Sequence, residues 1–545
     1  MNFPRSNVRL AGFLTLWLAI AAPAATAAEA PAANRAILTA AEPTPVPAAP
    51  LAPTSHPGFR QAQAVCTKCH LLPDPGLLPK AIWRDIVLKK MAFYTGILQF
   101  DVEKNEEGKL YKASGLFPNT PLLTREAWDQ IESYFLEYAP EGSLPHPPRE
   151  EISVGLRHFE LEKPRFRRTP PLTTLTVVDP VEHVVYTSDA TQQTLDILNP
   201  EGRLIGSLPV GNIPVWMKKT DDGIYLACIG HFFPKEERIG QLIFLERTAE
   251  GFNRRVLFSN LPRPCHVEVA DLNKDGKPDI LLCMFGYLTG RFSWFEGLGN
   301  NEYREHVLYD RAGPLVSVVR DFNGDGNPDI AMLVGQEAET LIIYYGDGKG
   351  GFPKSAEVFK KPPTYGHTYF EVADFDKDGR LDFMVCNGDN GDYDSPPKPY
   401  HGIRIYFDRG QGRYEEGLFY PLHGPFRAIA RDFDGDGDLD IAANCFYPDY
   451  EKNPRESFVY LENQGDLKFK PSTFKECISG RWVCLDVGDV DGDGDLDIVL
   501  GSLIRMPAST VPSFVRDAWE KTGPSVVILK NTLKRPSPSA EAAPK

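Results

Sequence analysis

A nine-residue acidic segment occurs five times in the second half of the chain and constrains the fold more than any other feature. The copies read DLNKDGKPD, DFNGDGNPD, DFDKDGRLD, DFDGDGDLD and DVDGDGDLD, and they begin at positions 271, 321, 374, 432 and 489. Apolar runs typical of strands flank each copy, such as HVEVAD before the first and DILLCM after it. A period of 50 to 58 residues with several short strands in each period is typical of the blades of a β-propeller.

The spacing of these repeats predicts a propeller of seven blades. Two further units without the acidic segment fit upstream, at 172–210 and 213–260. The region 169–532 then divides into seven units of about 52 residues, the usual size of a four-stranded blade. The last unit ends one strand short, after SVVILKN. Because a propeller has to close its ring, we expect the segment Ile152–Glu160 to supply the missing strand.

The acidic segments have the composition of metal-binding loops. Oxygen-bearing side chains occupy positions 1, 3, 5 and 9, and glycine occupies position 6. Ca²⁺ binds six to eight such oxygens, and the apolar position 12 excludes an EF-hand, which needs a glutamate there. We expect up to five Ca²⁺ ions, held more weakly in the first two loops, where Asn273, Asn323 and Asn327 replace acids. The alternative is five solvated turns without an ion, in which the crowded carboxylates repel one another.

The expected calcium ligands are the residues at positions 1, 3, 5 and 9 of each segment. They are Asp271, Asn273, Asp275 and Asp279; Asp321, Asn323, Asp325 and Asp329; Asp374, Asp376, Asp378 and Asp382; Asp432, Asp434, Asp436 and Asp440; and Asp489, Asp491, Asp493 and Asp497. These loops resemble those of the FG-GAP (VCBS) repeat family of extracellular β-propellers. The resemblance implies the fold and bound calcium, but the roles of the family range from adhesion to scaffolding, so it does not imply one function.

The segment CTKCH, Cys66–His70, is the second informative motif. Two thiols separated by two residues can form thioether bonds to both vinyl groups of a haem, and the adjacent histidine then binds the iron. A redox-active CxxC, a zinc site without its other ligands, and coincidence are the alternatives. We expect one covalent haem c at Cys66, Cys69 and His70. A single CxxCH disfavours a dihaem peroxidase.

The sixth iron ligand follows by elimination. Between Leu71 and Pro145 there is no histidine and one methionine, Met91, at the expected end of a helix that Pro79 begins. Thioether ligation raises the potential and suits electron transfer; a core-packing methionine beside an open iron is the alternative. Together with its helical flanks, one of them capped by Thr124, the motif resembles the class I cytochrome c fold. That resemblance covers residues 57–140 and is specific only at CTKCH.

The N-terminal 27 residues have the features of a secretory signal. Arg5 and Arg9 precede the apolar run Leu10–Ala22, and small residues follow at the cleavage site; a retained anchor is the alternative. We expect a periplasmic or extracellular protein whose mature chain has no integral membrane segment. The expected organisation is a signal peptide at 1–27, an Ala/Pro-rich linker at 28–55, a cytochrome c-like domain at 56–145, a propeller at 150–532 and a disordered tail at 533–545.

Charge and cysteine usage restrict the classes of partner. The net charge of −15 argues against a sequence-independent grip on nucleic-acid phosphates, so we expect no nucleic-acid partner. Seven cysteines lie outside CTKCH. Of these, Cys283, Cys386 and Cys445 recur inside apolar strand runs, which predicts small buried residues rather than a disulfide framework.

Candidate ligand-binding residues on the propeller come from two places. The residue five positions before each acidic segment should lie near the central channel, and these residues are His266, Val316, Tyr369, Arg427 and Cys484. Among them, His266, Tyr369 and Arg427 can bind an anionic or sugar-like group; the alternative is a polar lining of a wet tunnel. The insertion that begins at Asn387 adds Tyr393, Lys398 and His401 on a long loop, a frequent place for function. No set of nucleophile, base and orienting acid can be identified from spacing.

The expected fold is therefore multidomain: a small all-α cytochrome c module followed by an all-β seven-bladed propeller with calcium loops. The favoured function is that of an exported monohaem c-type cytochrome, which transfers electrons through a His/Met-ligated haem and docks a redox partner protein or another ligand on the propeller. One alternative is a haem-coupled oxidoreductase with a catalytic site at the channel mouth, drawing on His266, Tyr369, Arg427 or His401 and acting on a small molecule. The other is an extracellular adhesion or carbohydrate-binding scaffold, which leaves the haem without a role.

Overall fold

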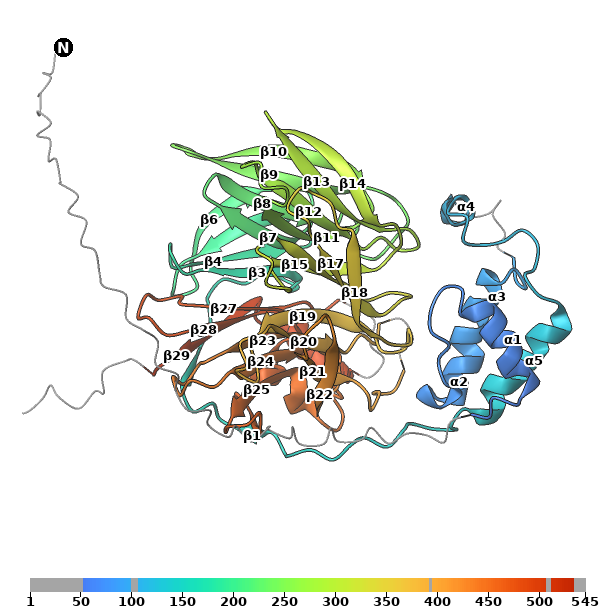
Figure 1. Cartoon of the computed structure of the whole chain (residues 1–545). Coiled ribbons are helices and arrows are strands. Elements are labelled where there is room, and N and C mark those ends of the chain that lie inside the picture. The colour runs from blue at the N-terminus through green and yellow to red at the C-terminus, as the bar shows by residue number, and fades with distance from the viewer. Residues whose placement is uncertain (1–51, 100–105, 392–394, 506–510, 534–545) are drawn as a thin grey trace, which may run out of the picture. The chain divides into compact units, whose positions relative to one another are not determined.

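The computed structural model describes residues 52–99, 106–391, 395–505 and 511–533, all within one unit, Ala40–Lys545. A helical region comes first along the chain, and seven sheets of mainly antiparallel strands follow it (Figure 1). The expected signal peptide, most of the expected linker, nearly all of the expected tail, and Tyr393 lie outside the described residues. Within those described ranges, none of the helices has both the length and the apolar character that a membrane span requires.

The helical region packs around a cluster of aromatic residues. Its elements are α1 (Pro57–Cys66), η1 (Pro75–Leu77), α2 (Lys80–Ile82), the π-helical turn η2 (Trp83–Val87), α3 (Leu88–Tyr94), α4 (Glu106–Ala113) and α5 (Arg125–Tyr138). Thr124 caps α5 as expected, because its hydroxyl oxygen accepts the Ala127 N–H at 3.2 Å. Trp83 and Trp128 are each 1% exposed in the core. Gly58 lets α1 cross α5 closely, since a Cβ there would lie 1.9 Å from the Gln130 carbonyl oxygen.

One helix is longer than the sequence indicated. Pro79 is the N-cap, and α2, η2 and α3 follow one another without a break, so the helical stretch does not end at Met91 but continues to Tyr94. The Met91 carbonyl oxygen accepts the Thr95 N–H at 2.9 Å and the Thr95 hydroxyl at 3.0 Å. These two bonds satisfy the end of the helix one turn beyond Met91.

Seven sheets form the propeller, one per blade, as the repeat spacing predicted. Blades one to four contain β3 (Thr173–Asp179), β4 (Val184–Asp189), β5 (Thr194–Leu198), β6 (Leu204–Pro209); β7 (Pro214–Thr220), β8 (Gly223–Cys228), β9 (Gly240–Thr248), β10 (Gly251–Leu261); β11 (Pro264–Ala270), β12 (Asp279–Met284), β13 (Arg291–Gly299), β14 (Glu302–Tyr309); and β15 (Pro314–Arg320), β16 (Asp329–Val334), β17 (Thr340–Tyr345), β18 (Lys354–Lys360). Blades five to seven contain β19 (His367–Ala373), β20 (Asp382–Asn387), β21 (Gly402–Asp408), β22 (Tyr414–Pro421); β23 (Pro425–Arg431), β24 (Asp440–Cys445), β25 (Phe458–Asn463), β26 (Phe469–Thr473); and β27 (Trp482–Gly488), β28 (Asp497–Ser502), β29 (Val526–Asn531). The first strands of neighbouring blades contact one another, which places them innermost.

The ring closes with an N-terminal strand, although not over the whole expected range. β2 (Phe159–Glu162) pairs antiparallel with β29 and completes the seventh blade, with Leu161 opposite Leu529. The earlier residues of Ile152–Glu160 belong to a different blade: β1 (Ser153–Val154) pairs in parallel with β26 of the sixth blade. Gly155, with φ of 117°, separates the two strands. The N-terminal segment therefore covers the open edges of two blades.

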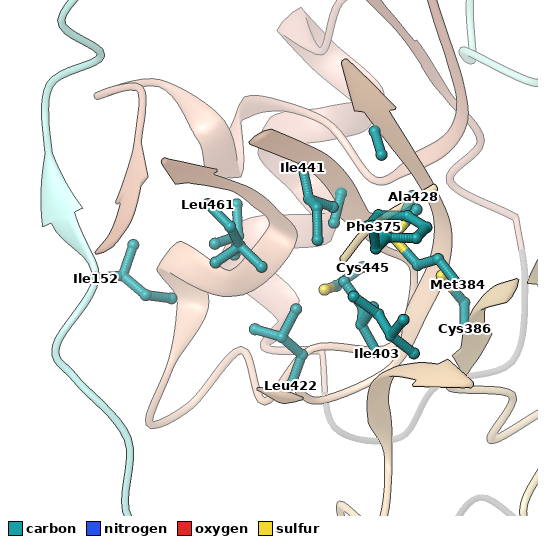
Figure 2. Close-up of a cluster of buried hydrophobic side chains, with 14 of the residues drawn as sticks. Ile152, Phe375, Met384, Cys386, Ile403, Leu422, Ala428, Ile441, Cys445 and Leu461 are labelled. Atoms are coloured by element: carbon teal, nitrogen blue, oxygen red, sulfur yellow. The ribbon is translucent and has the colours of Figure 1, made fainter. Parts of the chain in front are cut away.

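The propeller core lies between the faces of neighbouring blades, so the central strands are buried on both faces. In Figure 2, Met384 and Cys386 of β20 face the region of Ile441 and Cys445 of β24, with Leu461 of β25 beside them. The second strand of every blade is buried at all six positions, which explains its continuous apolar sequence. None of the nine cysteines, all of which lie within the described residues, forms a disulfide, and Cys283, Cys386 and Cys445 are small buried core residues as expected.

Three elements of the propeller region, a helix and two 3₁₀ turns, were not anticipated from the sequence. The connection from β28 to β29 contains a helix, α6 (Ser513–Thr522), whose Trp519 is 1% exposed against Tyr450. Two 3₁₀ turns, η3 (Pro454–Ser457) and η4 (Cys477–Ser479), flank blade six.

Candidate functional site

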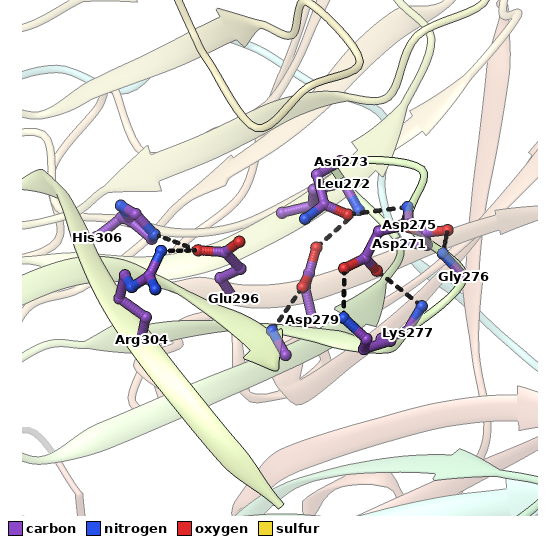
Figure 3. A network of polar contacts seen from close by, with 11 residues as sticks. Asp271, Leu272, Asn273, Asp275, Gly276, Lys277, Asp279, Glu296, Arg304 and His306 are labelled. Atoms are coloured by element: carbon purple, nitrogen blue, oxygen red, sulfur yellow. Dashed lines mark hydrogen bonds and ion pairs between the residues drawn. The ribbon is translucent and has the colours of Figure 1, made fainter. Parts of the chain in front are cut away.

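Each acidic segment forms the loop between the first and second strands of blades three to seven, and its own backbone holds the carboxylates in place. In the first loop the Asp271 carboxylate accepts the N–H groups of Asp275 at 3.1 Å and Gly276 at 2.9 Å (Figure 3). Asp275 in turn accepts the Lys277 N–H at 2.9 Å. Gly276 has φ of 82°, which only glycine adopts without strain, although the space beside it is open. These bonds hold the side chains at positions 1 and 5 against the backbone of the loop.

The aspartate at position 9 has a role that the sequence did not show. Asp279 is fully buried; one of its oxygens accepts the Leu272 N–H at 2.9 Å and the other accepts the Gly297 N–H at 2.8 Å. The equivalent bonds in the other loops join Asp329 to Phe322 and Gly346, Asp382 to Phe375 and Asp408, Asp440 to Phe433 and Asn463, and Asp497 to Val490 and Asn531. Each position-9 carboxylate therefore ties its loop to the end of the third strand of the same blade.

The loops differ in how closely they gather carboxylates. Among the described residues, three groups bring acidic oxygens within 4.8 Å of one another, and they are Asp374, Asp376 and Asp382; Asp432, Asp434 and Asp436; and Asp489, Asp491 and Asp493. All three belong to blades five to seven. In blade four, Lys274 from the neighbouring loop donates to Asn327 Oδ1 at 2.7 Å and to the Gly326 carbonyl at 2.9 Å. An ammonium group thus already lies against that loop.

The CTKCH segment begins at the last residue of α1, and the backbone holds the ring of its histidine. His70 Nδ1 lies 2.8 Å from the Leu71 carbonyl oxygen. Because a carbonyl can only accept, Nδ1 carries the proton, and in the neutral ring the lone pair is on Nε2. Burial lowers the pKa of His70, which favours the neutral form.

The two thiols of the segment do not have the electrostatics of a redox dithiol. Burial, with Cys69 as a second cause, raises the pKa of Cys66 to about 11, and burial also raises the pKa of Cys69. A redox-active CxxC needs the opposite shift, toward a stable thiolate.

A cavity of about 360 Å³ opens beside this segment. Cys66, His70 and Met91 all line it, so three of the four residues predicted to hold a haem face one space, while Cys69 is exposed beside it. The remaining wall on the helical side is mostly aromatic and aliphatic: Leu72, Trp83, Val87, Leu88, Phe93, Tyr94, Phe117, Trp128, Ile131 and Phe135.

The second wall of the cavity comes from the propeller, which the sequence did not predict. Tyr287, Gln336, Glu337, Glu339, Thr364 and Lys398 are its principal residues. Direct contacts connect the two sides: Arg311 Nη2 donates to the Cys69 carbonyl at 2.9 Å, and the Tyr400 hydroxyl donates to the Leu77 carbonyl at 3.1 Å. The only sequence signal for this wall is the insertion in blade five, which contains Lys398 and Tyr400.

The predicted channel residues converge, but they bind one another. The Arg427 guanidinium lies over the rings of Trp216, at 5.0 Å, and Tyr369, at 4.8 Å, and its Nη2 is 3.5 Å from Asp486 Oδ1. His266 packs on Trp216 with ring centroids 4.2 Å apart, and burial lowers its pKa to about 3. Spacing had not identified Trp216 or Asp486.

His401 does not join this group. It is 2% exposed in the blade-five insertion, where burial, followed by the positive charge of Lys398, lowers its pKa. The four predicted catalytic candidates therefore do not form one site, and Arg427 already has an internal ion-pair partner.

Comparison with known proteins supports the propeller part of the chain. A model of the FG-GAP-like repeat matches residues 271–332, 321–385 and 432–500. Each match begins at one acidic loop and ends in the strand that follows the next acidic loop. The chain thus carries FG-GAP-like repeats on a seven-bladed β-propeller. No curated protein sequence matches it.

Two solved structures show weak similarity. The calcium-binding protein regucalcin from Agrobacterium tumefaciens strain C58 is 11% identical, covering 68% of this chain and 96% of its own, with a TM-score of 0.32. The Dos1 propeller is 9% identical, covering 66% of this chain and 77% of its own, with a TM-score of 0.38.

Proposed function

We propose that this protein is an exported monohaem c-type cytochrome that transfers electrons through a haem held beside a calcium-stabilised propeller. The observation that carries the proposal is that Cys66, His70 and Met91 line one cavity. An iron-binding nitrogen, a thioether sulfur and an attachment thiol facing one apolar space suit a covalently bound porphyrin better than a redox dithiol or a zinc site.

The residues around the cavity fit the group. Cys66 and Cys69 provide the two attachment sulfurs, and the protonated Nδ1 of His70 bonds to the Leu71 carbonyl, which orients the ring for ligation through Nε2. Met91, which lines the same cavity, would supply a thioether ligand. The aromatic lining, including Trp83 and Phe135 with ring centroids 4.4 Å apart, would exclude water from a bound porphyrin. Bound haem supplies a single-electron couple between ferric and ferrous iron, and this lining favours the less charged ferrous state.

The propeller serves in this proposal as the scaffold that docks a redox partner protein. The predicted channel residues interact with one another and with neighbouring side chains, as Arg427 does in its ion pair with Asp486. This favours electron transfer over catalysis at the channel mouth. The acidic groups of blades five to seven would hold Ca²⁺, because oxygen clusters of this kind suit a hard cation. Export to the periplasm or beyond, where thioether attachment takes place, is consistent with the signal-like N-terminus.

The first test is covalent haem content. The purified full chain should give an alkaline pyridine haemochrome spectrum and a mass increase of one haem that survives denaturation. Cys66→Ala combined with Cys69→Ala should abolish both, while Cys484→Ala, a buried thiol of the propeller, should leave them unchanged. An exported chain whose mass equals that of the bare polypeptide would rule out the proposed function.

The second test concerns the sixth ligand. Met91→Leu keeps the side-chain volume and removes the sulfur, so the ferric spectrum should change from low spin to high spin and the midpoint potential should fall. Met217→Leu, in β7 of the propeller, is the matched control. An unchanged low-spin spectrum in Met91→Leu would assign the sixth position to another group.

A further inference from the structure

Two propeller loops meet the CTKCH segment through one ion pair. Arg311 lies in the loop between β14 and β15, and Glu337 lies in the loop between β16 and β17. Arg311 Nη2 donates to Glu337 Oε2 at 2.7 Å and to the Cys69 carbonyl oxygen at 2.9 Å. The same guanidinium therefore contacts both the propeller acid and the backbone of the residue that precedes His70.

A backbone hydrogen bond connects the two loops that carry this pair. The Gly335 N–H donates to the Gly313 carbonyl at 2.9 Å and joins one loop to the other. Glu337 and Glu339 have φ of 60° and 38°, a left-handed backbone that non-glycine residues rarely adopt. Strain of this kind persists where the surrounding structure holds it, and it concentrates at functional sites. Glu337 and His70 line the same cavity.

We infer that the propeller forms the second wall of the haem pocket and that Arg311, held by Glu337, is a positioning residue that fixes the Cys69–His70 backbone and sets the haem potential. This inference rests on the proposed function. Ferric iron carries one more positive charge than ferrous iron, so a nearby guanidinium destabilises the ferric state and raises the potential, and a carboxylate lowers it. The propeller would therefore tune the redox centre as well as support it.

The experiment measures the midpoint potential of the haem-loaded full chain by spectroelectrochemistry. Arg311→Gln should lower the potential, and Glu337→Gln should raise it. Arg304→Gln is the matched control. Arg304 of β14 forms an ion pair with Glu296 of β13 at 3.3 Å within blade three, and no contact joins that pair to the CTKCH motif among the described residues (Figure 3). Arg311→Lys keeps the charge, so its potential should lie closer to the wild type than that of Arg311→Gln.

The possible outcomes distinguish a failure of this inference from a failure of the proposed cytochrome function. Shifts of opposite sign in Arg311→Gln and Glu337→Gln, with no shift in Arg304→Gln, would support the inference. Potentials equal to the wild type in both variants, with full haem content, would overturn it and leave the cytochrome proposal intact. A wild-type chain without covalent haem would overturn the proposed function itself. If Arg311→Gln fails to incorporate haem, the potential of Glu337→Gln decides between the first two outcomes.

Discussion

The buried aspartate at position 9 of each acidic loop should stabilise its blade without any metal. Asp279 is the best position to test, because its loop is outside the three carboxylate groups that could hold a cation among the described residues. Its two oxygens accept the N–H groups of Leu272 and Gly297 at 2.9 Å and 2.8 Å in a fully buried position. We predict that Asp279→Ala is strongly destabilising.

The magnitude follows from the two bonds. A hydrogen bond to a charged group contributes about 1.5–3 kcal/mol, and a buried N–H left without a partner costs a similar amount. Losing both bonds should therefore lower the free energy of unfolding by about 3–5 kcal/mol, a large part of the total stability of a typical protein. Asp279→Asn retains one acceptor oxygen and should lie between the alanine variant and the wild type.

Urea denaturation followed by tryptophan fluorescence, with EDTA present throughout, measures this effect apart from metal binding. Asp275→Ala is the control in the same loop, because the Asp275 side chain is partly exposed and bonds only within the loop. It should cost less than about 1 kcal/mol. An Asp279→Ala variant that is no less stable than Asp275→Ala would refute the structural role of position 9.

Three further predictions concern metal, acid and ring closure. EDTA should lower the melting temperature of the wild type because an ion bound only to the folded state stabilises it. Asp434→Asn should reduce this EDTA-induced fall in melting temperature, and Asn273→Ala should not. Equal melting curves with and without EDTA would count against structural calcium. Burial lowers the pKa of His266 to about 3, so its contribution to stability is complete above the unfolded-state pKa of about 6.5 and is lost as the pH falls toward 3, by about 4–5 kcal/mol in total. His266→Gln should flatten the acid limb of a stability-against-pH curve in that window; an unchanged slope would contradict the assignment. Glu160→Pro removes a ladder bond where β2 meets β29, because Glu160 lies opposite Lys530 at a hydrogen-bonded pair of the register. It should destabilise the propeller by about 3 kcal/mol in a denaturant melt, whereas Val154→Pro in the short strand β1 should cost much less. Similar costs for the two variants would argue against closure through β2.

Features that depend on neighbouring residues were predictable from the sequence. The loop at Asp271–Asp279 follows from glycine at position 6 and from carboxylates that bond to amides within a few residues. The helix after Thr124 follows from its cap and its apolar stripe. The number of blades follows from the repeat period, because each blade is built from one continuous stretch of chain.

Features that depend on distant residues were not. Asp279 was expected to be a calcium ligand only, because its second partner, Gly297, belongs to a strand that begins twelve residues later. The closing strand was expected at Ile152–Glu160, but the register with β29 selects Phe159–Glu162. Arg427 was a candidate ligand-binding residue, with a polar channel lining as the alternative; in the structure Asp486 and Trp216 approach it from two other blades.

The sequence by itself determined the repeat, the acidic loops and the CTKCH motif, because each of these is a pattern of adjacent residues whose chemistry acts within a turn or a strand. Only the tertiary structure decided which side chains face the cavity, which carboxylates are tied to backbone amides, and which propeller residues reach Cys69. Those contacts join residues that are tens to hundreds of positions apart, and ring closure and the packing of blade on blade bring them together. Arg311 and Cys69, 242 positions apart in the chain and hydrogen-bonded in the fold, are an example that no local pattern contains.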